Sequence, residues 1–118
     1  MIAKKRYCEV LSEAITESGK SKIAFYTELG IKKAYFYDII KGKVNPPPRE
    51  KQLEIIRILS PDTNTCIKLF ETAAEERGEI SADLFLFIDN EKKKKLRKQE
   101  EYVQFIEKIK EGDIKNVR

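Results

Sequence analysis

Apolar residues recur at three- and four-residue spacing along most of the chain, which is the spacing of amphipathic helices. The first such segment spans Arg6–Glu17, and Gly19 ends it. Its apolar positions are Tyr7, Val10, Leu11, Ala14 and Ile15. A second, shorter segment begins after Ser21, whose hydroxyl can cap its first turn, and stops at Gly30. Its expected buried residues are Ile23, Phe25, Tyr26 and Leu29.

A third helix is predicted over Lys33–Lys41, shortly after Gly30. Glycine adopts the left-handed conformation that a tight turn needs, and Ile31 is expected to fill the space between the two helices. The inward positions of this helix are Phe36, Ile39 and Ile40. Asn45–Pro48 cannot continue a helix, so a stiff connector should lead to a fourth helix from Arg49. Its apolar positions are Leu53, Ile55, Ile56, Ile58 and Leu59.

The second half of the chain continues the helical pattern. Ser60-Pro61-Asp62 is typical of a helix start, with Ser60 as the capping residue. The apolar positions that follow, up to Gly78, are Cys66, Leu69, Phe70, Ala73 and Ala74. A short helix is expected at Ala82–Asp89, since no second strand candidate exists to pair with its apolar run, and a long helix at Glu91–Glu111.

These patterns together predict an all-α protein. Its first unit, called the head below, spans residues 1–78, and a C-terminal helical extension spans residues 79–118. The apolar run in Ala82–Asp89 needs cover on all sides, from neighbouring helices or from a second subunit. The extension should therefore pack on the head, form a dimer, or do both. The dimer-interface candidates are Leu84, Phe85, Phe87, Tyr102, Phe105, Ile106 and Ile109.

Charge is distributed unevenly along the 118 residues, of which 41% are hydrophobic and 37% charged. Met1–Leu59 contains 12 Lys and Arg against 7 Asp and Glu, a net charge of +5, whereas Ser60–Arg118 has 12 against 13, or −1. The basic excess therefore lies in the first half. A surface that faces nucleic-acid phosphates requires such an excess.

Several function classes find no support in the residues. The chain has no histidine, and Cys8 and Cys66 fall at apolar helical positions, so both are interpreted as reduced core residues and no metal site is expected. No nucleophile has a recognisable base partner and no glycine-rich phosphate loop follows a strand, so we expect neither an enzyme nor a cofactor. With no signal peptide and no run of ~20 apolar residues, the expected location is the cytoplasm, without membrane contact.

Ser21–Pro48 combines a short helix, a glycine turn, a second helix and a proline stop, which is a helix-turn-helix. Its Leu29-Gly30-Ile31, Tyr35-Phe36-Tyr37-Asp38-Ile39, Lys41-Gly42-Lys43 and Asn45-Pro46 segments resemble the Xre or lambda-repressor-like family of regulators. The resemblance covers roughly Arg6–Leu59. It implies a lambda-repressor-like five-helix DNA-binding head followed by additional C-terminal helices, a bacterial or phage origin, and double-stranded DNA as the partner.

The same resemblance implies which residues contact bases. They are Lys33, Ala34, Tyr37 and Asp38, on the outward face of the third helix. Lysine can donate to guanine O6 and N7, alanine can pack on a thymine methyl group, and aspartate can accept from cytosine N4. A carboxylate in a groove is repelled by phosphates unless it meets such an amino group. The presence of Asp38 is therefore consistent with either sharp sequence specificity or no DNA binding at all.

Phosphate contacts are implied for polar residues around the two helices. They are Ser21, Lys22, Lys32, Lys41, Lys43, Asn45 and Arg49. Such contacts set the register of a protein on DNA rather than its sequence preference. Lys32 stands where the family commonly has a capping Ser or Thr, and the missing cap together with a cation at the positive helix end costs ~1 kcal/mol. A bound phosphate would offset that cost.

Two hypotheses follow. The first is a sequence-specific transcriptional regulator, acting as a repressor and as a homodimer on a near-palindromic operator. The alternative is a protein-interaction module on the same scaffold, such as an antitoxin or an inhibitor of a nucleic-acid enzyme, which binds its partner through Tyr35, Tyr37 or the Leu84–Ile88 run. Lys32 and Asp38 favour the alternative slightly, and the +5 charge of the first half opposes it.

Overall fold

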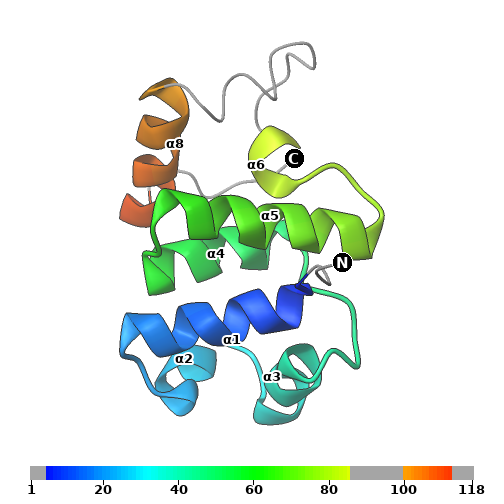
Figure 1. Ribbon diagram of the computed structural model, residues 1–118. Helices are drawn as coiled ribbons and strands as arrows, with labels where there is room; N and C mark the ends of the chain where they lie inside the picture. The colour runs from blue at the N-terminus through cyan, green and yellow to red at the C-terminus, as the bar shows by residue number, and fades with distance from the viewer. Residues whose placement is uncertain (1–4, 86–99, 113–118) are drawn as a thin grey trace.

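The computed structural model describes residues 5–85 and 100–112, and every regular element within these ranges is an α-helix (Figure 1). The all-α prediction is therefore confirmed for the described chain. The helices are α1 Tyr7–Ser18, α2 Lys22–Leu29, α3 Lys33–Ile40, α4 Arg49–Leu59, α5 Thr63–Arg77, α6 Ala82–Phe85 and α8 Glu100–Glu111.

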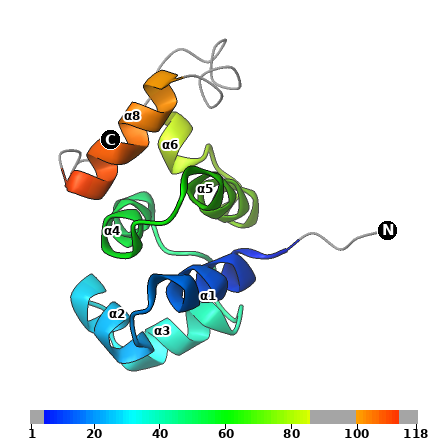
Figure 2. The same ribbon diagram turned by 60° about the vertical axis from the view of Figure 1, so that its left-hand side comes forward.

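The helices are arranged in three levels (Figures 1 and 2). Helices α2 and α3 form one end, α1, α4 and α5 cross the middle, and α6 and α8 form the opposite end. Helix α1 packs against α3, α4 and α5, while α2 contacts both α3 and α4. Helix α8 lies on α4 and α5, as does α6. The described helices of the C-terminal extension, α6 and α8, thus pack on α4 and α5.

An aromatic cluster fixes α3 to its neighbours. Phe36 is fully buried, and its ring centroid lies 5.7 Å from that of Phe25 and 5.3 Å from that of Tyr26. Ile23 was expected to join this buried side, but its side chain is 66% exposed. Two residues turn a helix by about 200°, so Ile23 and Phe25 point to nearly opposite sides of α2. Phe25 occupies the inner side, which leaves Ile23 in solvent.

The helices begin and end near the predicted capping and helix-ending residues, with one correction. Ser21 caps α2 by accepting a hydrogen bond from the Ala24 amide at 3.0 Å. Ser60, however, does not cap α5: its φ of 47° is left-handed, and it ends α4 instead. Asp62 is the N-cap of α5, and its Oδ1 accepts from the Thr65 amide at 2.7 Å. An N-cap needs extended backbone, which Asp62 has and Ser60 does not.

The C-terminal helices complete the core of this same chain. Tyr102, Ile106 and Ile109 are at most 1% exposed, and α8 covers α4 with them. These three residues are therefore no longer dimer-interface candidates, because their own chain already covers them. Phe105 is half-buried against the core. Leu84 and Phe85 belong to α6, whereas Phe87 and the predicted helical segments between residues 86 and 99 lie outside the described residues.

Candidate nucleic-acid interface

A three-residue turn, Gly30-Ile31-Lys32, joins α2 to α3. Gly30 has a φ of 79°, and its amide donates to the carbonyl oxygens of Tyr26 and Thr27. This backbone geometry favours glycine, as the sequence predicted. The ammonium group of Lys51 on α4 donates to the Leu29 carbonyl at 2.9 Å. A cation at the negative end of α2 stabilises that end and ties the turn to the middle of the molecule.

Helix α3 has a buried side and an open side. Phe36 and Ile39 are buried, whereas Lys33 and Ala34 are exposed. Tyr37 is half-buried, with its ring edge-on to Phe36 at 5.2 Å between centroids. Asp38 is also half-buried. Of the four predicted base-contacting residues, Lys33 and Ala34 are thus exposed, while Tyr37 and Asp38 are half-buried.

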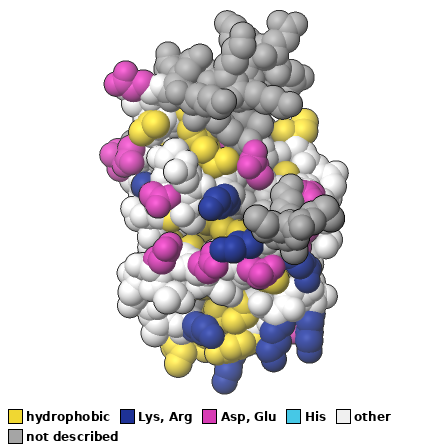
Figure 3. Space-filling model, viewed as in Figure 1, with side chains coloured by type: hydrophobic (Ala, Val, Ile, Leu, Met, Phe, Trp, Pro, Cys, Tyr) yellow, Lys and Arg dark blue, Asp and Glu magenta, His cyan; other side chains and the backbone are white. Residues whose placement is uncertain are grey.

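Exposed lysines surround this open side. Among the residues that the structure describes, Lys22, Lys32, Lys33, Lys41 and Lys43 form no ion pair, although Lys41 lies 6.0 Å above the Tyr37 ring. The space-filling view shows basic side chains gathered at the end of the molecule that α2 and α3 form, with acidic ones across the middle (Figure 3). The charges of these lysines are therefore not compensated by a carboxylate of the described chain.

The starts of α2 and α3 differ in how they are capped. Because the Ser21 oxygen accepts from Ala24, its hydroxyl hydrogen can still be donated to a phosphate. Lys32 precedes α3 with extended backbone and makes no side-chain cap, as predicted. The first amides of α3 therefore lack a side-chain acceptor from the N-cap. Unbonded amides and the positive end of the helix dipole both favour an anion at this position.

The connector after α3 is held from three sides. Arg6, before α1, donates through Nη2 to the Gly42 carbonyl at 3.3 Å. Arg77 on α5 donates to the Pro46 carbonyl, and Gln52 on α4 to the Pro47 carbonyl, both at 2.9 Å. The sequence predicted a stiff connector but none of these bonds. The bonds of Arg6 and Arg77 join residues 36 and 31 positions apart in the chain, so no local pattern indicates them.

The predicted phosphate contacts of the connector have different surroundings. Lys41, Lys43 and Asn45 are exposed, as such contacts require. Arg49 is half-buried, and its Nη2 donates to the Ile80 carbonyl at 3.4 Å in the segment between α5 and α6. Arg49 therefore has a structural contact that competes with the predicted phosphate contact, which makes it the weakest member of the set.

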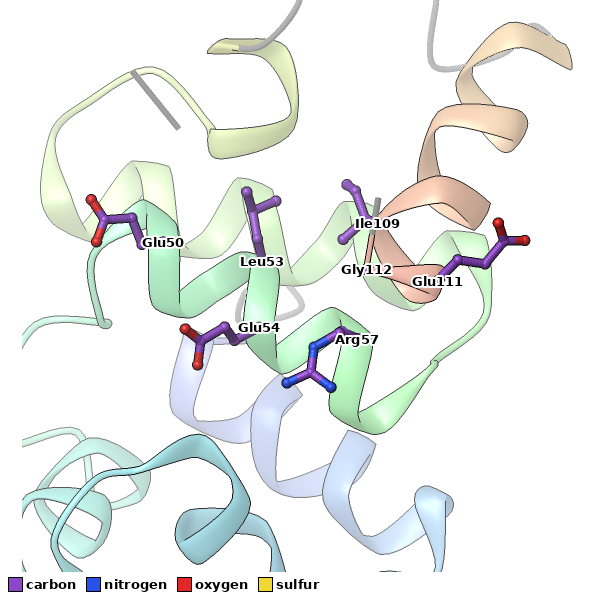
Figure 4. A pocket seen from close by; sticks show the side chains of 7 residues that line it. All are labelled: Glu50, Leu53, Glu54, Arg57, Ile109, Glu111 and Gly112. Atoms are coloured by element: carbon purple, nitrogen blue, oxygen red, sulfur yellow. The ribbon is translucent and has the colours of Figure 1, made fainter. Parts of the chain in front are cut away.

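A groove of about 530 Å³ lies between α4 and α8 (Figure 4). Its floor is formed by Leu53 and Ile109, and its walls carry three carboxylates and the guanidinium group of Arg57. The carboxylates belong to Glu50, Glu54 and Glu111. An acidic groove repels a phosphate backbone, so this face is not part of the candidate interface.

The described residues offer little for metal or thiol chemistry. None of their Cys, Asp and Glu side chains gather in a group that could hold a metal ion. Both cysteines are free thiols: Cys66 is buried, as predicted, whereas Cys8 is only half-buried. Burial raises the pKa of the Cys66 thiol to about 12, so it stays protonated and unreactive near neutral pH. In the same part of the chain, no helix has the length and apolar content to cross a bilayer.

Protein-family models, curated proteins and solved structures were all compared with this chain, and no match was found. The resemblance to the Xre or lambda-repressor-like family thus rests on the residues quoted above.

Proposed function

We propose that this chain is a sequence-specific, double-stranded DNA-binding transcriptional regulator with a lambda-repressor-like head. The observation that carries the proposal is the set of five exposed lysines without ion pairs around the open side of α3, namely Lys22, Lys32, Lys33, Lys41 and Lys43. The opposite side of α3 is fixed to the core through Phe36 and Ile39. A rigid helix framed by cations has the properties needed to enter a major groove.

The positions of the lysines along the chain support binding in a groove. Lys22 begins α2 and Lys32 precedes α3, whereas Lys41 and Lys43 follow α3. The lysines thus flank α3 at both of its ends, and a major groove is bounded by a phosphate backbone on each side. Each phosphate that a lysine neutralises contributes about −0.9 to the slope of log affinity against log salt concentration. Affinity for any duplex should therefore fall steeply with added salt.

The simplest regulatory action is repression in the cytoplasm by blocking access of polymerase to an operator. A dimer would place two α3 helices in successive major grooves about 34–36 Å apart, on a near-palindromic site. Because Tyr102, Ile106 and Ile109 are covered within the chain, the dimer contact falls to the remaining candidates. These are Leu84, Phe85, Phe87 and Phe105.

The deciding experiment is selection of bound sequences from a random duplex pool. Wild type should enrich an inverted repeat, and Lys33→Ala should lose that enrichment. Lys68→Ala is the matched control, because Lys68 is an exposed lysine on α5, outside the helix-turn-helix. An enriched single half-site would contradict the dimer but keep DNA binding. No enrichment by wild type would overturn the proposal.

A protein-interaction role is the second candidate, and two exposed apolar side chains favour it. Ile23 on α2 is 66% exposed and Tyr35 on α3 is 37% exposed, at the end of the molecule that carries the lysines. Aromatic and aliphatic side chains on a surface are typical anchors of protein interfaces. Under this role, binding of duplex DNA would be undetectable at physiological salt, whereas the regulator should retain it.

A further inference from the structure

The segment after α3 carries two of the predicted phosphate contacts, Lys41 and Lys43, on either side of Gly42. The Gly42 carbonyl accepts from Nη2 of Arg6 at 3.3 Å, and the same Nη2 lies 3.3 Å from Oε1 of Glu76. Neither Arg6 nor Glu76 belongs to the helix-turn-helix, because Arg6 precedes α1 and Glu76 is on α5. A contact from outside the motif thus reaches the peptide between the two lysines.

Glu76 holds Arg6 in place while being held itself. Its second oxygen, Oε2, accepts from the Tyr7 amide at 2.7 Å, at the start of α1. A carboxylate at a helix N-terminus is stabilised by the helix dipole. The Glu76 side chain is 23% exposed, whereas that of Arg6 is 53% exposed. The more buried carboxylate, which also accepts from the Tyr7 amide, therefore orients the more exposed guanidinium.

Gly42 is shaped to receive this guanidinium. Its φ is 74°, and a Cβ atom built there would lie 2.5 Å from Nη1 of Arg6. Glycine is thus the residue that permits both the backbone turn and the close approach of Arg6. The Lys43 amide also donates to the Asp38 carbonyl at 2.9 Å. The peptide between Lys41 and Lys43 is therefore fixed by Arg6 on one side and by α3 on the other.

We propose that Arg6, oriented by Glu76, is a positioning residue for DNA-backbone binding: it fixes the Gly42 peptide and so the directions in which Lys41 and Lys43 leave the chain. This inference rests on the proposed function and deepens it. A segment that is ordered before binding loses less conformational entropy when its lysines meet phosphates. Arg6 itself has its charge matched by Glu76, unlike Lys41 and Lys43, so it acts through them.

A double-mutant cycle on the full chain tests this role. Affinity for the duplex selected by wild type is measured over a series of salt concentrations for Arg6→Ala, Lys43→Ala and the double variant. Arg6→Ala should weaken binding about fivefold. It should also reduce the magnitude of the slope of log affinity against log salt concentration by about 0.9 to 1.8, because one or both lysines lose their contact with a phosphate. In the Arg6→Ala background, Lys43→Ala should then add less than about twofold.

Two further variants separate positioning from folding. Glu76→Gln keeps an oxygen that can accept from Tyr7 but loses the charge that orients Arg6, so it should reproduce part of the Arg6→Ala effect. Arg57→Ala removes a guanidinium that lines the acidic groove between α4 and α8, and it should leave affinity and salt slope unchanged. Thermal unfolding of each variant, followed by circular dichroism, gives the folded fraction with which affinities are corrected. Should Arg6→Ala fail to fold, the cycle is run with Glu76→Gln in its place.

The outcomes distinguish the inference from the proposed function. Strictly additive effects of Arg6→Ala and Lys43→Ala would show that Arg6 acts independently of Lys43 and would overturn the positioning role. Unchanged affinity in a folded Arg6→Ala protein would overturn it as well, while leaving DNA binding intact. Failure of wild type to bind any duplex would overturn the proposed function, and the inference with it.

Discussion

At the α6–α8 end of the molecule, polar side chains are bonded to one another, whereas five lysines at the α2–α3 end face solvent. The Tyr102 hydroxyl donates to Asp83 Oδ2 at 2.7 Å in a buried site, and Lys110 lies 3.5 Å from Glu107. At the other end, the five lysines around α3 have no carboxylate partner in the described chain. Uncompensated like charges repel one another and lower stability. The difference is that charged and polar groups at one end contribute to the fold, whereas the lysine charges at the other end are left uncompensated within the described chain.

The largest expected effect is on the buried side of α3. Phe36→Ala should lower the free energy of unfolding by about 3–5 kcal/mol, because it removes a fully buried ring that contacts Phe25 and Tyr26. Urea unfolding measures the loss. Tyr35→Ala, at a neighbouring but 37% exposed position, should cost much less. Equal losses from both substitutions would contradict the division of α3 into a structural side and a binding side.

Tyr102→Phe tests the α6–α8 end. We expect a loss of about 1–3 kcal/mol in unfolding free energy, because the buried Asp83 carboxylate loses a hydrogen bond. Urea unfolding gives the stability, and a DNA titration of the folded protein gives the affinity. Affinity should not change. A variant with native stability but weaker DNA binding would show that the two ends are not separate in role.

The lysines at the α2–α3 end should behave in the opposite way. Lys33→Ala should cost ~1–3 kcal/mol of binding to the selected duplex and relax its specificity, whereas Lys43→Ala should weaken all duplexes similarly. Both lysines are exposed, so unfolding free energies should change by less than about 0.5 kcal/mol. Parallel titrations with selected and random duplexes check this. If both variants weakened the two duplexes equally, base contact by Lys33 would be ruled out.

Lys32→Ser should raise stability while weakening DNA binding. Serine can cap α3, and the substitution removes a cation from the positive helix end, so unfolding free energy should rise by about 1 kcal/mol. The magnitude of the slope of log DNA affinity against log salt concentration should decrease by about 0.9 if Lys32 contacts a phosphate. Chemical unfolding and a salt titration measure the two effects. A gain in both properties would mean that the uncapped lysine has no binding role.

The smallest expected effect is a loss of stability at alkaline pH, caused by burial of the Cys66 thiol. Burial raises the pKa of its thiol from 9.0 to about 12, so the folded protein keeps a proton that the unfolded chain releases above pH 9. Stability should therefore fall as pH rises from 9 toward 12, by under about 1 kcal/mol at pH 9.5. Urea unfolding of wild type and Cys66→Ala across this range isolates the contribution. Burial of Tyr7 also raises its pKa and acts in the same direction at higher pH.

Features that depend on nearby residues were predictable from the sequence. The helices, the Gly30 turn, the Ser21 cap and the start of α4 at Arg49 all follow from periodicity and punctuation within a few positions. Ile23 was assigned wrongly because the burial of α2 depends on which side meets α3 and α4, and its short apolar pattern does not determine that side. The same limit applied to α8, whose apolar stripe fits a core and a dimer interface equally well.

The contacts that shape the candidate interface were not predictable. Arg6 and Gly42 are 36 residues apart, Arg77 and Pro46 are 31 apart, and Lys51 and Leu29 are 22 apart. Each bond ends on a backbone carbonyl, which every residue possesses, so the acceptor leaves no trace in the residue types. Such bonds become visible only when the helices are packed.

The open side of α3 also affects how this protein could change over time. In the described chain, the side chains of Lys33, Ala34 and Asp38 make no hydrogen bond, while the turn before them and the connector after them are anchored by Lys51, Arg6, Arg77 and Gln52. Mutations at these three positions are therefore expected to be nearly neutral for folding. If α3 reads bases as proposed, a lineage could drift from one target sequence to another through these positions, and a library randomised there should yield mostly folded variants with new preferences.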